Sequence, residues 1–300
     1  MSNDDELSKK VEDWVTKEGI SLEYFSANCF NRAGFEIFQG YYVKGMADTR
    51  EIDVMGHCTY PMGNSYLRLY SVAECKWSKG KPWAVFNSPA TEMTNSAVIS
   101  ETIGNEVGSA LLWYVAGDKE ICELEIFNGA RICGFSGRQA LGDKNSQDYF
   151  YPAIQGVVDK TVQLLNSYDN NVVNELKWIV SGFPMIIVDA PLFEINYDPA
   201  SDTVAAKEVD YSRIRWRGSS AWKLIASVDV VTKKYLPTYL VGLTRQFDIM
   251  AKRMQAYLPD MRKFLETGDI NCLNISEVSR GVGQPWFISQ RINRNRKYGI

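Results

Sequence analysis

Apolar residues recur at a helical period near the start of the chain. Leu7, Val11, Trp14 and Val15 follow the three- and four-residue spacing of a helix, which predicts an amphipathic helix over residues 4–18. An element of this kind has one apolar stripe and one polar face.

A second helix and a strand are predicted next. Ser21 is a suitable N-cap for a helix over residues 21–33, and Gly34 suits its C-terminal end. The apolar run that follows predicts a strand over residues 35–43.

Two further strand-like runs, residues 50–54 and 66–77, flank a turn-rich segment at 61–65. This order predicts a β-hairpin. We take Gly63 and Asn64 as the two loop residues, a hypothesis that fixes the register of the whole hairpin.

That register gathers charged residues on one surface. Opposed residues in a tight antiparallel hairpin have a constant index sum, which pairs Asp53 with Glu74 and Glu51 with Lys76. Because strand side chains alternate between faces, the four charged groups are predicted to share one face. A one-residue bulge would shift this pairing. The opposite face would pack under a helix with Ile52, Val54, Ala73, Cys75 and Trp77.

Two neighbouring carboxylates indicate a candidate metal site. Asp53 and Glu74 would repel each other, and a hard divalent cation with oxygen ligands relieves that repulsion. Such a cation can polarise a phosphate and lower the pKa of a bound water, while Lys76 can stabilise charge on the phosphate. The alternative is a surface hairpin with cross-strand ion pairs, which needs no catalytic role.

The combination of Asp53 with Glu74-Cys75-Lys76 resembles the bipartite active-site motif of the PD-(D/E)XK nuclease superfamily, the restriction-endonuclease-like fold. The resemblance implies that Asp53 and Glu74 are metal ligands, that the main-chain carbonyl of Cys75 assists them, and that Lys76 assists the attacking water. Many members also have a Glu on the first helix, and Glu23 occupies the corresponding place, as a further metal ligand or as a favourable anion in the first helical turn.

The resemblance extends over residues 1–90, with one departure: Ile52 stands where many members have a proline. It implies an α/β fold with a restriction-endonuclease-like core, a central mixed β-sheet flanked by helices and an inserted segment. It also implies a metal-dependent endonuclease that hydrolyses DNA with Mg²⁺, for which Mn²⁺ may substitute. Relatives of this kind often serve bacterial restriction or antiphage defence, as homo-oligomers or as subunits of a defence complex.

Composition and charge limit which kinds of nucleic-acid contact, metal site and location are expected for this protein. The 300 residues are 45% hydrophobic and carry a formal net charge of −3, so any DNA contact is expected to be local or made by an assembly. The six cysteines form no C-x-x-C pair and His57 is the single histidine, which argues against a zinc site. We expect reduced thiols, a cytoplasmic protein and no membrane contact, because no apolar signal or spanning run is present.

Two groups of basic residues are candidates for DNA binding. Lys79 and Lys81 follow the hairpin, and Arg213, Arg215 and Arg217 alternate along a predicted strand at 209–217. Both groups can contact phosphates. They can equally be a solvated loop and an edge strand guarded by charge.

The rest of the chain predicts an interrupted core. We expect residues 1–265 to form the nuclease-like core with an insertion at about 88–170, and residues 266–300 to form a C-terminal extension with a basic tail. Further predicted elements are strands at 110–116, 122–127, 183–195 and 227–231, and helices at 152–180 and 234–258.

Two other functional classes remain open. One is a nuclease-like fold that binds nucleic acid or a protein partner without hydrolysis. The other is a nuclease subunit that is activated only by a partner or a signal.

Overall fold

The computed structural model describes residues 3–17, 19–44, 49–78, 80–88, 93–129, 134–142, 148–168, 178–218, 225–267 and 269–273. Three parts of the predictions lie outside these ranges: Lys79, residues 169–177 of the helix predicted at 152–180, and residues 274–300 of the C-terminal extension with its basic tail.

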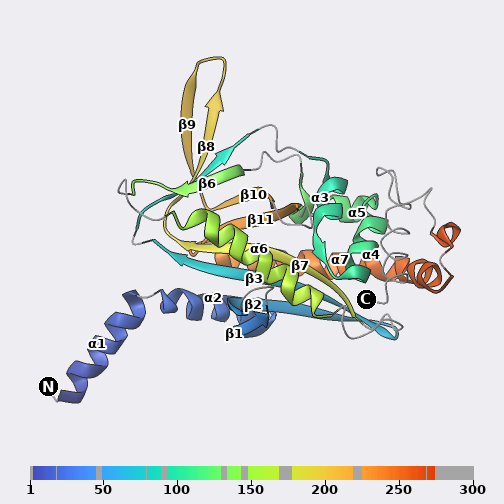
Figure 1. Ribbon diagram of the computed structural model, residues 1–300, viewed down its shortest axis with the longest axis horizontal. Helices are drawn as coiled ribbons and strands as arrows, with labels where there is room; N and C mark the ends of the chain where they lie inside the picture. Colours follow the sequence, from blue (N-terminus) through green and yellow to red (C-terminus); the bar gives the residue numbers. More distant parts are fainter. Residues whose placement is uncertain are drawn as a thin grey trace.

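One mixed sheet of 11 strands organises the described residues (Figure 1). Its order is β1-β2-β3-β7-β11-β10-β6-β4-β8-β9, and β5 pairs with β7 beside this path. The strands are β1 (Glu36–Lys44), β2 (Thr49–Met62), β3 (Ser65–Trp77), β4 (Trp83–Asn87), β5 (Ile103–Gly104), β6 (Gly134–Gln139), β7 (Trp178–Asp189), β8 (Leu192–Asp198), β9 (Thr203–Val209), β10 (Tyr211–Arg217) and β11 (Ile225–Thr232).

Helices cover both faces of this sheet. They are α1 (Asn3–Lys17), α2 (Ile20–Arg32), α3 (Asn95–Glu101), α4 (Glu106–Val115), α5 (Lys119–Cys122), α6 (Phe150–Asn166) and α7 (Leu236–Thr267), with short 3-10 turns at η2 (Glu125–Phe127) and η4 (Ile270–Cys272). An α/β protein with a large mixed sheet and flanking helices is therefore confirmed.

The two faces have separate hydrophobic cores. The first unites α2, α4 and α7 with the sheet, and the second unites α6 with the other face. On β3 the partition follows the alternation of strand side chains, since Leu69 and Ala73 enter the first core while Tyr70 and Val72 enter the second. Glu74 continues the Tyr70–Val72 series and therefore faces α6.

The N-terminal elements match the prediction closely. The hairpin pairs β2 with β3 from Met62–Ser65 to Val54–Ala73, which confirms the two-residue loop and the register over this stretch. The predicted pairs Asp53–Glu74 and Glu51–Lys76 lie beyond the paired stretch of the two strands. The predicted N-cap was wrong, because Gly19 holds that position with φ 83° and no side-chain cap. A glycine adopts this left-handed conformation without steric penalty.

The central segment differs more from the prediction. Residues 110–116 form most of α4 and not a strand, because short apolar runs suit a buried helix equally well. Asn105 caps this helix by accepting a hydrogen bond from the N–H of Gly108 at 2.9 Å. Residues 122–127 likewise form the end of α5 and a 3-10 turn, with Asp118 as the cap of α5.

The predicted helix at 152–180 and strand at 183–195 also have different limits. α6 ends at Asn166, and Ile179 belongs to β7. The apolar run is divided into β7 and β8 at Pro191, which has no N–H to donate to a sheet ladder. β7 pairs with β3 in parallel, so it lies next to the hairpin in the sheet.

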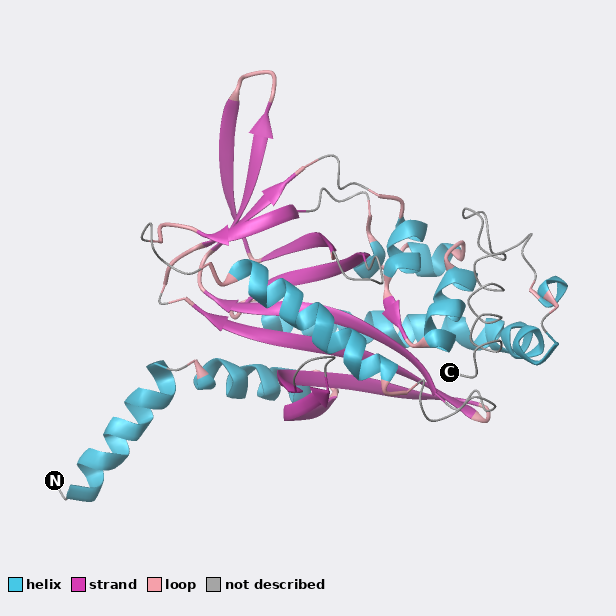
Figure 2. Cartoon of the chain, viewed as in Figure 1, coloured by secondary structure: helices cyan, strands magenta, loops and turns pink. Residues whose placement is uncertain are grey.

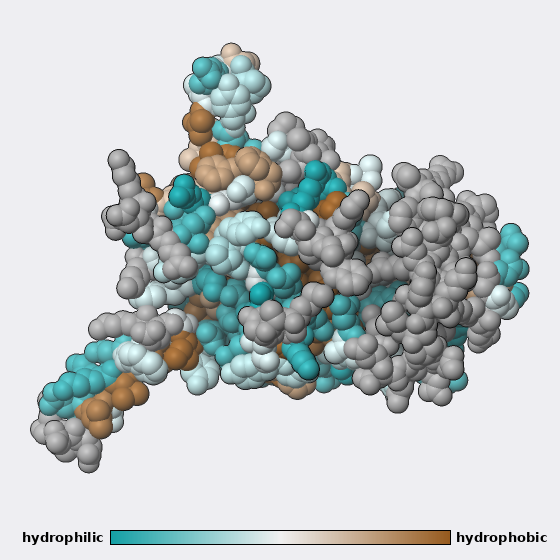
Figure 3. Space-filling view, in the orientation of Figure 1, coloured by the Kyte–Doolittle hydropathy of each residue, from teal (hydrophilic) through white to brown (hydrophobic). Residues whose placement is uncertain are grey.

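Two parts of the chain project from the rest. Figure 2 shows β8 and β9 as a two-stranded arm and α1 as an isolated helix. Figure 3 shows an apolar stripe along α1, where Leu7, Val11 and Trp14 are more than half exposed. Among the described helices, none is long and apolar enough to cross a membrane.

Candidate active site

Asp53 and Glu74 of the hairpin both face α6, and the regular alternation of side chains along β2 is broken at Asp53. On β1, Gly40 has φ 58° and lies between the pairs Gln39–Val54 and Tyr41–Ile52. Ile52 belongs to the core on the α6 side and Val54 to the opposite core. The prediction that these two residues share a face was therefore wrong, because the strand alternation is interrupted at Asp53.

Glu74 is the centre of the charged cluster. Its Oε1 accepts a hydrogen bond from Nζ of Lys76 at 2.6 Å, and its Oε2 accepts one from Nζ of Lys160 at 2.5 Å. Lys160 lies on α6, and its Nζ is also 3.5 Å from Oδ1 of Asp53. The side chains of these residues are between 10% and 28% exposed, so the four of them form a largely desolvated cluster, which is called the pocket below.

Asp53 is held by the backbone as well as by charge. The N–H of Cys75 donates a hydrogen bond to its Oδ2 at 2.8 Å. Burial and the neighbouring Glu74 nevertheless raise the pKa of Asp53, against the opposing influence of Lys160. The shift therefore reflects the loss of solvent around Asp53 first and the nearness of a second carboxylate after it.

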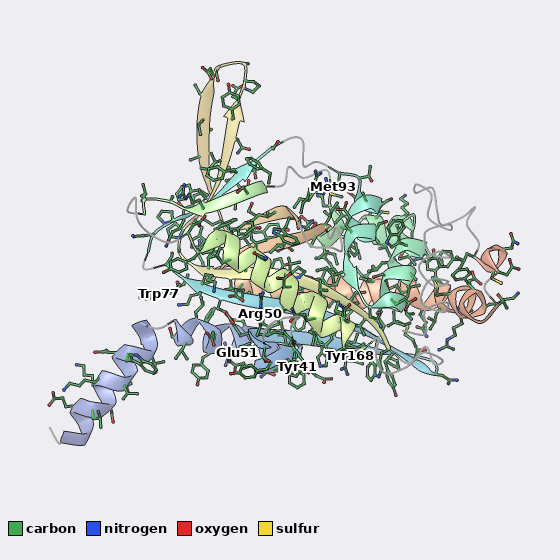
Figure 4. All side chains as sticks on the ribbon, viewed as in Figure 1. Tyr41, Arg50, Glu51, Trp77, Met93 and Tyr168 are labelled. Atoms are coloured by element: carbon green, nitrogen blue, oxygen red, sulfur yellow. The ribbon has the colours of Figure 1, made fainter. Side chains whose placement is uncertain are left out.

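Glu23 is a third carboxylate near this pair. Burial raises its pKa to about 7, and the carboxylates of Asp53, Glu51 and Glu74 add to the effect. Glu23 lies in the first turn of α2, so this helix points an acidic residue at the hairpin. Figure 4 labels Arg50 and Glu51 of β2, which lie below α6 in this view.

Lys76 remains a cation in this pocket. Burial alone would lower its pKa, but Glu74 and then Asp53 outweigh burial and raise it. A lysine in this state donates hydrogen bonds and stabilises negative charge, and it is not suited to accept a proton near neutral pH.

Cys75 contacts the charged cluster through its backbone N–H and not through its thiol. Its Sγ lies 3.6 Å from Oγ of Ser26 on α2, on the face away from α6. Burial raises the pKa of this thiol, so it stays protonated.

The carboxylate oxygens of Asp53 and Glu74 are the type of ligand that a hard divalent cation prefers. Asp53 and Glu74 present oxygen atoms to one ammonium, that of Lys160, and Mg²⁺ prefers such oxygen donors. Within the described ranges, no three His, Cys, Asp or Glu side chains form a ready-made metal site. In this structure Lys160 holds the two carboxylates at the point where a bridging cation would bind.

Lys160 was missed by the sequence analysis. It lies on the apolar side of α6, at helical spacing from Ala153, Val157 and Leu164, all of which are buried. A lysine within the buried stripe of an amphipathic helix is a signal that something acidic faces it.

The structure does not bring the predicted DNA-binding residues together at the site. Arg213 is 3% exposed and its Nε donates to Oδ1 of Asp229 at 2.7 Å, so it is inaccessible to a phosphate. Arg215 is ion-paired with Glu101 at 2.7 Å. The alternation of the three arginines on β10 is confirmed, but only Arg217 is exposed. Lys81 is half-buried in the loop after β3.

Comparison with protein-family models, with curated proteins and with solved structures finds no match to this chain. The geometry of the site is therefore the basis on which a function is assigned.

Proposed function

We propose that the protein is a metal-dependent nuclease that hydrolyses DNA phosphodiester bonds at the pocket between the β2–β3 hairpin, α2 and α6. The observation that carries this proposal is the largely buried pair Asp53 and Glu74, with Glu23 as a third carboxylate nearby and beside Lys76, a lysine that stays charged. An acidic pocket by itself repels a phosphodiester, so it suits one only together with a cation.

Asp53 and Glu74 would hold that cation, with the main-chain carbonyl of Cys75 beside them. A divalent ion there would supply Lewis-acid polarisation of the phosphate and a water of lowered pKa. The backbone N–H of Cys75 orients the Asp53 carboxylate, and burial keeps bulk water from screening it.

Lys76 and Glu23 have complementary roles in this account. Lys76 stays protonated and stabilises the negative charge that develops on the phosphate. Glu23, with a pKa of about 7, can accept a proton from the attacking water or hold one near neutral pH.

A cleavage assay tests this proposal. Purified protein is incubated with labelled DNA in Mg²⁺, in Mn²⁺ and in EDTA, beside the variants Asp53→Asn and Glu74→Gln. We expect cleavage with either metal, none in EDTA, and a loss of about 10³-fold or more in both variants.

Asp248→Asn is the matched control, because Asp248 is an exposed carboxylate on α7 that accepts a hydrogen bond from Tyr60 at 2.8 Å. It should cleave at the wild-type rate. Cleavage that survives in Asp53→Asn would refute the assignment of the site. DNA binding without cleavage in any metal would indicate a binding module instead.

A further inference from the structure

We propose that Lys160 is a built-in counter-ion that occupies the cation position between Asp53 and Glu74 and leaves it when a divalent metal binds. This inference rests on the proposed function, because it concerns the same pocket. It makes metal binding an exchange of one cation for another.

The geometry places one ammonium on two carboxylates. Nζ of Lys160 donates to Oε2 of Glu74 and lies 3.5 Å from Oδ1 of Asp53. A bridging metal needs an oxygen from each of the same two residues. Two cations cannot share these oxygens, because their mutual repulsion is weakly screened in a pocket where the Lys160 side chain is 10% exposed.

The other lysine does not compete in this way. Lys76 binds Oε1 of Glu74, on the opposite side of the carboxylate from Lys160. It can therefore keep its hydrogen bond while Lys160 leaves. Lys160 reaches the pocket from α6 on a flexible four-carbon stem, so it can withdraw without a movement of the sheet.

The arrangement has a physical advantage for the metal-free protein. The side chains of Asp53 and Glu74 are both largely buried, and Nζ of Lys160 lies within 3.5 Å of an oxygen of each. Without Lys160, the pair would lose an ammonium that compensates both carboxylates, and the hairpin would be less stable. Lys160 thus preserves the pocket in the absence of metal, at the expense of metal affinity.

Direct titration with Mn²⁺, followed by electron paramagnetic resonance of the free ion, tests the exchange. Lys160→Met removes the competing charge and keeps the length of the side chain. We expect it to bind Mn²⁺ about tenfold more tightly than the wild type, and to unfold at a lower temperature without metal. Lys160→Arg keeps the charge and should retain the weaker binding.

Lys233→Met is the matched control, because Lys233 forms an ion pair with Asp189 at 2.8 Å in which both side chains are about a third exposed. It should bind Mn²⁺ as the wild type does. If Lys160→Met binds Mn²⁺ no more tightly than the wild type, Lys160 is a fixed ion pair and the inference is wrong.

A second measurement uses the wild-type protein, in case Lys160→Met does not fold. Acylation of lysine amines is followed by mass spectrometry with and without Mn²⁺. We expect Lys160 to react slowly without metal and faster with it, while Lys233 is unchanged. Mn²⁺ binding that leaves the reactivity of Lys160 unchanged would overturn the exchange and leave the nuclease proposal standing. If the wild type binds no Mn²⁺, or Asp53→Asn binds it equally well, both proposals fail.

Discussion

The sheet carries two buried charged clusters that differ in how completely their charges are matched. At the β10–β11 pair, Asp229 accepts hydrogen bonds from Nε of Arg213 at 2.7 Å and from the hydroxyls of Tyr211 at 3.0 Å and Tyr239 at 2.7 Å. One carboxylate thus meets one guanidinium and two neutral donors. Arg213 is 3% exposed, so the cluster is also closed to solvent.

The cluster at the β2–β3 hairpin has three carboxylates, those of Asp53, Glu74 and Glu23, against the two ammoniums of Lys76 and Lys160. Asp53 and Glu74 share the ammonium of Lys160, and Glu23 adds a third carboxylate whose pKa is raised to about 7. The side chain of Lys76 is 28% exposed. A protein gains no stability from crowding carboxylates in this way, so the comparison separates an ion pair that supports the fold from a cluster prepared for a ligand.

The largest expected difference between the two clusters is in stability. Asp229→Asn leaves the buried Arg213 without a counter-ion, so we expect it to lower the free energy of unfolding by about 3–5 kcal/mol. Asp53→Asn removes a carboxylate whose charged form is already disfavoured, so we expect a change within about 1 kcal/mol. Urea unfolding of the two variants without metal measures both. Equal losses would place Asp53 among the structural ion pairs.

An intermediate effect is expected for Lys76. Replacing it with Met removes the cation nearest the reacting phosphate in our account, so cleavage should fall by about 10²-fold while the protein stays folded. Lys76→Arg keeps the charge but changes its shape and hydration, so only partial recovery is expected. Single-turnover cleavage beside circular dichroism provides the measurement. Wild-type rates in Lys76→Met would remove this residue from the mechanism.

The smallest expected effect is a pH dependence from Glu23. Its pKa rises from 4.5 to about 7 on folding, so between these values the folded state holds a proton that the unfolded state has lost. Stability therefore falls as the pH rises through this window. Because Glu23 is partly exposed, we expect about 1 kcal/mol after allowance for solvent screening.

Urea unfolding at pH 5 and pH 7.5 in the absence of metal measures this contribution, with Glu23→Gln as the comparison. The variant should lose less stability between the two pH values than the wild type does. Identical pH dependence in both proteins would show that Glu23 does not sense the carboxylates of the pocket.

Local sequence signals predicted the part of the site that lies on one hairpin. A two-residue turn fixes the register of the hairpin up to the Val54–Ala73 pair, next to Asp53 and Glu74, and strand alternation places Lys76 beside Glu74. The interruption at Gly40 was not predictable, because it depends on the conformation of a neighbouring strand.

Contacts between segments that are far apart in the chain were the other feature of the site that the sequence did not predict. Lys160 reaches Asp53 across 107 residues of sequence, and only the packing of α6 on β3 and β7 brings the two together. Arg213 looked available for phosphate because its strand alternates charged and apolar residues. Its burial depends on Asp229 in the next strand and on Tyr239 of α7.

The most direct test of the whole account is a crystal soaked in Mn²⁺ and measured for anomalous scattering. We expect a single strong peak between the carboxylates of Asp53 and Glu74, with the ammonium of Lys160 moved away from both and Lys76 still bound to Glu74. A crystal that shows no peak there, with Lys160 still seated on the two carboxylates at saturating Mn²⁺, would contradict the claim that this pocket is a metal-dependent catalytic site.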